Sequence, residues 1–125
     1  MILLDTSVLV ETLGAGGRLR GALREAIADG QRIAIPSLVL YEWLRGPRLP
    51  GELQAQEALF PAKEALGFGP EEAKLATELY RTVRRPRGRE VDLAIAASAL
   101  ALEATLWTLK LRDFDDIPGL ALRND

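Results

Sequence analysis

The sequence contains neither cysteine nor histidine. Without cysteine the chain can form no disulfide and offers no thiolate nucleophile, and without histidine it cannot form a Ser-His-Asp triad. The usual zinc sites, which depend on these two residue types, are excluded as well. Any enzyme chemistry must therefore rest mainly on aspartate and glutamate, whose hard oxygen ligands favour magnesium or manganese.

Long apolar runs are also missing, because no stretch approaches the roughly 20 residues that cross a membrane. The first residues, MILLDTS, lack the basic segment and small-residue cleavage site of a signal peptide. We therefore expect a cytoplasmic protein without a membrane partner. The 125 residues and 48% hydrophobic content suit one globular domain with its own core, which we expect to span residues 1–125.

The net charge of −2 does not by itself indicate a nucleic-acid-binding protein. The basic residues are nevertheless unevenly distributed, since 13 of the 16 are arginine. Five of them fall close together: Arg81, Arg84, Arg85, Arg87 and Arg89. Arginine suits bidentate contact with phosphate, but a solvated helix end and loop, a coding bias or thermal adaptation would produce the same pattern.

Short apolar segments alternate along the chain with segments of helical periodicity. The predicted strands span residues 1–4, 32–35, 105–109 and 120–122. The predicted helices span residues 8–13, 18–29, 38–45, 52–66 with an interruption near Pro61, 70–85 and 91–103. Such alternation predicts an α/β fold in which a parallel sheet has helices on both sides.

The predicted helix over residues 91–103 reads VDLAIAASALALE and is almost entirely small or apolar. Helical spacing places Asp92 on the same stripe as Ile95, Ala96 and Ala99. A lone carboxylate beside an apolar stripe is costly unless its charge is compensated. Two explanations stay open at this point: amide groups at the helix start compensate the charge, or a metal ion shared with other carboxylates does.

Further carboxylates lie at element ends or on an inward helix face. Asp5 follows the first predicted strand, where it could equally cap the next helix. Glu42 lies on the apolar face of its predicted helix, although a solvated helix face is an alternative. A loop after the third strand contains three more acids, which could simply be solvated: Asp113, Asp115 and Asp116.

Taken together, these four segments predict an acidic site. Ligands of open parallel sheets bind beyond the carboxyl ends of the strands, where several of these acids are expected. Carboxylates brought close together repel one another unless a cation neutralises them. A magnesium ion held by such a cluster activates water and stabilises a leaving alkoxide without help from histidine or cysteine. The acids therefore favour metal-dependent phosphodiester hydrolysis.

At four places the sequence resembles the PIN-domain ribonucleases, and specifically the VapC-type toxins of toxin–antitoxin pairs. ILLDTSVLV is similar to the family's first motif and IAIPSLVLYEWLRG to the second, while VDLAIAASAL resembles the third and TLWTLKLRDFDDIPGLAL the C-terminal one. The residues that match the family's functional positions are Asp5, Ser7, Glu42, Asp92, Thr108 and Asp113. One departure is Lys110, because many members have asparagine or aspartate two residues after the C-terminal threonine.

The resemblance implies a PIN-like three-layer α/β/α fold and an endonuclease for single-stranded RNA that needs Mg²⁺ or Mn²⁺. It implies that Asp5 and Asp92 bind the metal directly, and that Glu42 and Asp113 complete the acidic pocket as catalytic residues. The supporting polar residues would be Thr6, Ser7 and Thr108.

The resemblance also implies partners: an RNA substrate, a cognate antitoxin and a second copy in a homodimer. The candidate RNA contacts are Arg84, Arg85, Arg87, Arg89 and Lys110. Trp43, Leu44 and the helical region 52–66 could form the antitoxin or dimer surface, with core packing as the alternative. A catalytically silent PIN-like module that only binds RNA or protein is the second functional hypothesis.

Overall fold

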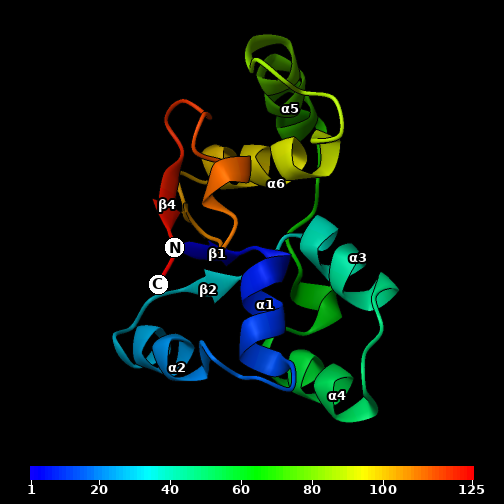
Figure 1. Ribbon diagram of the computed structural model, residues 1–125, viewed down its shortest axis with the longest axis vertical. Helices are drawn as coiled ribbons and strands as arrows, with labels where there is room; N and C mark the ends of the chain where they lie inside the picture. Colours follow the sequence, from blue (N-terminus) through cyan, green and yellow to red (C-terminus); the bar gives the residue numbers. More distant parts are fainter.

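The structure, a computed structural model, describes residues 1–125 (Figure 1). Its four strands are β1 (Ile2–Leu4), β2 (Ile33–Ala34), β3 (Thr105–Trp107) and β4 (Ala121–Arg123). Its α-helices are α1 (Thr6–Leu13), α2 (Arg20–Ala28), α3 (Ser37–Arg45), α4 (Pro50–Leu59), α5 (Pro70–Thr82) and α6 (Glu90–Ala101). Single 3₁₀ turns span Ala62–Glu64 and Leu111–Asp113.

The strands form one sheet in the order β2-β1-β3-β4, and every neighbouring pair is parallel. The chain moves from β1 to its neighbour β2 at one edge of the sheet, and then returns past β1 to β3 on its other side. Right-handed crossovers place α1 and α2 on one face of the sheet and α6, the last helix before β3, on the other. Helices α3 and α4 of the second connection pack against α1. In Figure 1, α5 and α6 lie together at the top of the view, with α1, α2 and α4 in its lower half. The predicted α/β fold with a short parallel sheet is confirmed.

Helix α6 lies in the core, as its apolar sequence predicts. Ile95, Ala96 and Ala99 are fully buried, and Asp92 stands one turn before them. The small side chains of this helix allow α5 to pack closely along it, and these two helices form the most extensive packing between elements of the fold. The start of α6 is thereby held at a defined place beside the sheet.

Several element boundaries differ from the predictions. Helix α5 ends at Thr82 rather than near Arg85, because the backbone at Val83 is extended and its side chain is buried. The residue before a proline avoids the helical region, which keeps Arg85 out of the helix too. Helix α6 ends at Ala101, two residues early, and Glu103 has a positive φ of 51°. Helix α4 stops at Leu59, which confirms the interruption near Pro61.

Of the two alternatives for Trp43, core packing holds and a partner surface does not. Its side chain is fully buried in the core, and the Arg48 guanidinium covers its ring at 4.1 Å. The neighbouring Leu44 does face outward and is 51% exposed. Periodicity alone could not decide which of the two faces the core, because adjacent apolar side chains point about 100° apart and the docking of α3 selects one of them.

None of the helices is both long enough and apolar enough to span a membrane.

Candidate active site

Asp5 directly follows β1, and Thr108 directly follows β3. The register of these parallel neighbours pairs Leu4 with Trp107, so Asp5 and Thr108 emerge side by side at the carboxyl edge of the sheet. Thr108 Oγ1 donates a hydrogen bond of 2.7 Å to Asp5 Oδ2. Both residues are buried, Asp5 to 2% exposure, so the carboxylate has exchanged water for fixed protein donors.

Asp5 does not cap α1 with its side chain, although it occupies the capping position. The same Oδ2 instead accepts a second hydrogen bond of 3.0 Å from Ser7 Oγ. Ser7 Oγ in turn accepts the Leu109 N–H at 3.0 Å, and Thr108 Oγ1 accepts the Lys110 N–H at 3.0 Å. These bonds orient the hydroxyls toward Asp5, so the capping explanation gives way to a carboxylate positioned by the turn after β3.

Glu42 enters from α3, on the helix face that also carries the buried Val39. Its Oε1 accepts a hydrogen bond of 2.6 Å from Thr6 Oγ1, which links α3 to the start of α1. Its Oε2 lies 3.6 Å from Arg45 Nη2 on the exposed side of the helix. Glu42 is therefore half-buried and held on two sides, rather than on a solvated face.

Asp92 lies in the first turn of α6, but its side chain makes no capping hydrogen bond. Burial raises the pKa of the Asp92 carboxyl from 3.8 to about 6, and the charges of Asp5 and Asp113 contribute to this rise. Glu42 adds to the same effect, whereas the ammonium of Lys110 lowers the Asp92 pKa. The charges of Asp5, Glu42 and two residues of the loop after β3 thus act on this one carboxylate, so Asp92 lies within the electrostatic range of the other acids.

The three acids of the loop after β3 have different surroundings. Asp113 is half-buried and its charge reaches Asp92, whereas Asp115 is exposed and its side chain makes no hydrogen bond or ion pair. Asp116 binds the guanidinium of Arg89, and this contact lowers the pKa of the Asp116 carboxyl. Among the loop acids, Asp113 is therefore the one whose charge acts on Asp92.

The hard carboxylate and hydroxyl oxygens gathered here are donors that suit Mg²⁺ or Mn²⁺. No three acidic side chains lie close enough together to hold one ion among them in this arrangement. The other carboxylates act on Asp92 through their charge. Asp5 and Glu42 each accept a hydrogen bond from a neighbouring threonine hydroxyl. The oxygen donors are therefore of the chemical type that binds a divalent cation, although the acidic side chains are not close enough together to share one in this structure.

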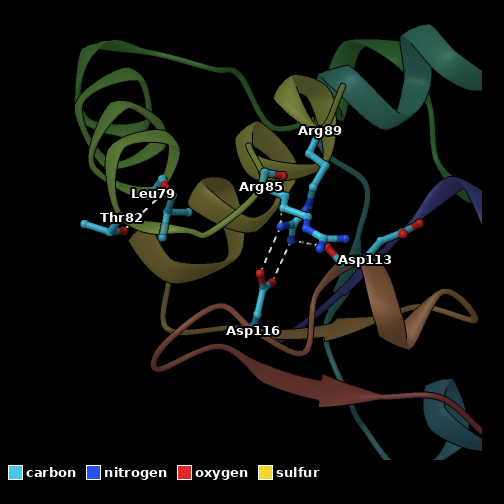
Figure 2. A network of polar contacts seen from close by, with 6 residues as sticks. All are labelled: Leu79, Thr82, Arg85, Arg89, Asp113 and Asp116. Carbon is cyan, nitrogen blue, oxygen red and sulfur yellow. Dashed lines mark hydrogen bonds and ion pairs between the residues drawn. The ribbon is translucent and has the colours of Figure 1, made fainter. Parts of the chain in front are cut away.

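Basic residues surround this edge unevenly. An open cleft runs beside Glu42, and Arg45 and Lys110 line it together with Thr6 and Ser7. Arg89 has both of its terminal nitrogens engaged by the loop after β3 (Figure 2). Its contact with that loop was not predicted, because the only signal in the sequence was an arginine three residues before Asp92. Three other arginines before α6 are exposed and form no ion pair: Arg84, Arg85 and Arg87.

The sequence matches the family model for the PIN domain over residues 2–120. Over 122 residues it is 36% identical to Ribonuclease VapC19 of Mycobacterium tuberculosis, with 96% of this chain and 97% of that protein covered. The same identity and coverage are found for VapC19 in the strains CDC 1551 and H37Rv.

Two solved structures with a similar fold are VapBC structures with bound DNA. VapBC2 from Rickettsia felis, bound to a DNA fragment from its promoter, gives a TM-score of 0.76 at 25% identity, covering 100% of this chain and 99% of that chain. DNA-bound VapBC from Salmonella typhimurium gives a TM-score of 0.73 at 25% identity, covering 98% of this chain and 96% of that chain.

Proposed function

Because this chain belongs to the PIN-domain family, among the relatives of VapC ribonucleases, we propose that it is a toxin-type endoribonuclease that hydrolyses phosphodiester bonds in single-stranded RNA with a divalent metal ion. The observation that carries the proposal is a set of acids held near the carboxyl edge of the sheet: hydroxyls fix Asp5 and Glu42, and their charges act on the half-buried Asp92, whose pKa is raised. Ionised acids from three other segments act on this half-buried carboxylate and repel it, and a bound cation would offset this repulsion.

Each acid has a role in this proposal. Asp5 and Asp92 would bind the cation directly, since they come from the rigid end of β1 and the first turn of α6. Glu42 and Asp113 would complete the pocket through water or by orienting the attacking water. The hydroxyls of Thr108 and Ser7 hold Asp5, and the hydroxyl of Thr6 holds Glu42, so the acids are oriented before RNA arrives.

The cation would be Mg²⁺ or Mn²⁺, in keeping with an all-oxygen donor set. When bound, it supplies the charge that polarises the scissile phosphate, lowers the pKa of a bound water and stabilises the departing alkoxide. The protein groups supply the geometry: they fix the carboxylates, exclude part of the solvent and leave the cleft beside Glu42 open for the RNA chain.

RNA would reach the site along the basic residues at its border. Three arginines before α6 are exposed and form no ion pair, and Lys110 is exposed three residues after β3. The arginines are Arg84, Arg85 and Arg87. Such side chains contact the phosphate backbone without reading the base sequence, which makes binding dependent on salt.

The proposed partners are a cognate antitoxin and a second copy of this chain. The VapBC structures are complexes of this type, which supports an antitoxin partner. An apolar groove between α1, α2 and α4 offers room for one, since Ile27 and Leu59 line it and are about half exposed. Co-expression with a small neighbouring gene tests this partner, with a stable and nuclease-inactive complex as the expected result. Light scattering on the isolated chain tests the homodimer.

The experiment that tests the activity is cleavage of end-labelled RNA with Mg²⁺, with Mn²⁺ and with a chelator. We expect the wild-type chain to cut single-stranded RNA with metal and to stop when the metal is removed. Asp92→Asn should remove cleavage while circular dichroism stays unchanged, and Glu78→Gln on the exposed side of α5 serves as the control. Cleavage that survives chelation would contradict the metal mechanism, and no cleavage under any condition would favour the silent binding module.

A further inference from the structure

Arg89 connects the start of α6 to the loop that follows β3. Its Nη1 and Nη2 donate hydrogen bonds of 2.9 and 2.6 Å to the two carboxylate oxygens of Asp116. Nη2 also donates to the main-chain carbonyl oxygen of Asp113 at 2.9 Å. Figure 2 shows the guanidinium facing the Asp116 carboxylate, while the Asp113 side chain points elsewhere. The bidentate pair is the geometry in which arginine binds a carboxylate most strongly.

The two segments joined by this contact each carry a proposed catalytic acid. Asp92 lies three residues after Arg89, and Asp113 lies three residues before Asp116. Arg89 binds the backbone of Asp113 and the side chain of Asp116, so it leaves the Asp113 carboxylate free to face the acidic site. Arg89 thus joins the start of α6, which carries Asp92, to the loop that carries Asp113, and it makes no hydrogen bond to either of these two carboxylates.

The contact is partly shielded from water. The Arg89 side chain is 18% exposed, whereas the Asp116 side chain is 41% exposed, so water reaches the carboxylate end of the pair and screens it. The bidentate geometry and the additional hydrogen bond to the Asp113 carbonyl oxygen hold the guanidinium in place. The loop has a second anchor, since Phe114 and Ile117 are buried in the core. Removal of Arg89 should therefore leave the fold intact but release the local orientation of the Asp113 backbone.

We propose that Arg89 is a positioning residue: it clamps the loop after β3 against the start of α6 so that the carboxylates of Asp92 and Asp113 belong to one site. This inference rests on the proposed function. It also separates Arg89 from its exposed neighbours, because its terminal nitrogens are already engaged, whereas Arg84 and Arg87 have no protein partner.

Hydrogen exchange tests the clamp in metal-free protein without any reference to nuclease activity. The amides of Asp113 and Asp115 donate within the loop, to the carbonyls of Lys110 and Leu111. Arg89→Gln and Asp116→Asn should each speed exchange of these amides by about tenfold or more, while the melting temperature and exchange elsewhere change little. Asp115→Asn is the matched control and should leave exchange unchanged. Unaltered loop exchange in both Arg89→Gln and Asp116→Asn would overturn the clamp even if the chain proves to cut no RNA.

Kinetics then distinguishes positioning from charge. Arg89→Gln and Asp116→Asn should lower kcat by a similar factor of about 10 to 100 with little change in KM, and the double variant should be no worse than either single one. Arg89→Lys keeps the charge but cannot form the planar fork, so it should resemble Arg89→Gln. A wild-type kcat in Arg89→Lys, or in Asp116→Asn alone, would overturn the proposal.

RNA binding in an inactive Asp92→Asn background separates the clamp from a phosphate contact. Adding Arg89→Gln should leave the dependence of RNA affinity on salt unchanged. A slope that falls by about 0.7 would mean that Arg89 contacts a phosphate, and this would contradict the clamp.

Discussion

The hydroxyl of Thr108 donates a hydrogen bond of 2.7 Å to Asp5 Oδ2, between residues that are 103 positions apart in the chain. The bond exists because β1 and β3 are parallel neighbours whose last residues are in register. It joins the ends of two central strands and fixes the rotamer of a buried carboxylate. The same hydrogen bond therefore contributes to the stability of the sheet and to the orientation of a proposed metal-binding carboxylate.

Thr108→Val should destabilise the protein, because it replaces a donor to a buried carboxylate with a methyl group. Removing a hydrogen bond to a charged group costs about 1.5–3 kcal/mol, and we expect the free energy of unfolding in urea to fall by about that amount. Thr108→Ser retains the hydroxyl and should recover most of this stability. Equal stability of the Val and Ser variants would show that the bond contributes nothing.

Asp92→Asn should stabilise the metal-free protein at neutral pH and not in acid. The folded-state pKa of Asp92 is raised from 3.8 to about 6, so ionisation of Asp92 is less favourable in the folded than in the unfolded chain. The penalty is absent below pH 3.8, grows up to about pH 6 and stays constant above it. Because Asp92 is partly solvated, we expect a gain of about 1–2 kcal/mol at pH 8. Thermal unfolding of the wild type and of Asp92→Asn, with chelator at about pH 8 and at about pH 3.5, measures this gain. A melting temperature of Asp92→Asn at about pH 8 that is equal to or lower than that of the wild type would contradict the raised pKa of Asp92.

Lys110→Gln should raise the pKa of Asp92 above its value of about 6. The ammonium of Lys110 favours the ionised carboxylate, and its removal leaves the neighbouring acids unopposed. Carboxyl chemical shifts of metal-free protein titrated with pH report the change. Lys110→Arg should leave the pKa near its wild-type value, as should Lys63→Gln, whose exposed side chain does not act on Asp92. No difference between the Gln and Arg variants at position 110 would place Lys110 away from the site.

Neutralising the exposed arginines should weaken RNA binding in a way that depends on salt. We expect Arg84→Gln, Arg85→Gln and Arg87→Gln, each in the Asp92→Asn background, to reduce the slope of log affinity against log salt. The reduction should be about 0.7 for every arginine that binds a phosphate. Arg32→Gln is a suitable control, because Arg32 is exposed at the amino end of β2, the opposite edge of the sheet. Slopes that match the control would remove the arginine run from the RNA path.

The main elements of the fold follow from local patterns. A parallel α/β sheet could be predicted from the short apolar runs around β1 and β3 and from the small, apolar residues of α6. Continuous apolar runs are typical of strands that are buried on both faces, and a helix without a polar face must be buried as well. The exact ends of helices were not predictable. Helix α5 stops before Val83 because that side chain is drawn into the core, which is a tertiary effect.

The details of the site depend on register and on side-chain partners that no local pattern contains. The bond between Thr108 and Asp5 follows from the pairing of Leu4 with Trp107, which cannot be read from the local sequence around either residue. Arg89 resembles its neighbours in composition and differs only through the partner that the loop after β3 brings to it. It stays a prediction that metal binding and catalysis depend on four acids: Asp5, Glu42, Asp92 and Asp113.

The most direct test of the central claim is the binding of Mn²⁺ to the isolated chain, measured by calorimetry in the absence of RNA. We predict one site, weakened by about tenfold or more in Asp5→Asn and in Asp92→Asn, while Glu78→Gln binds as the wild type does. If both Asp variants retain the wild-type affinity, the carboxylates at the end of β1 and the start of α6 do not hold a common cation, and the central claim is contradicted.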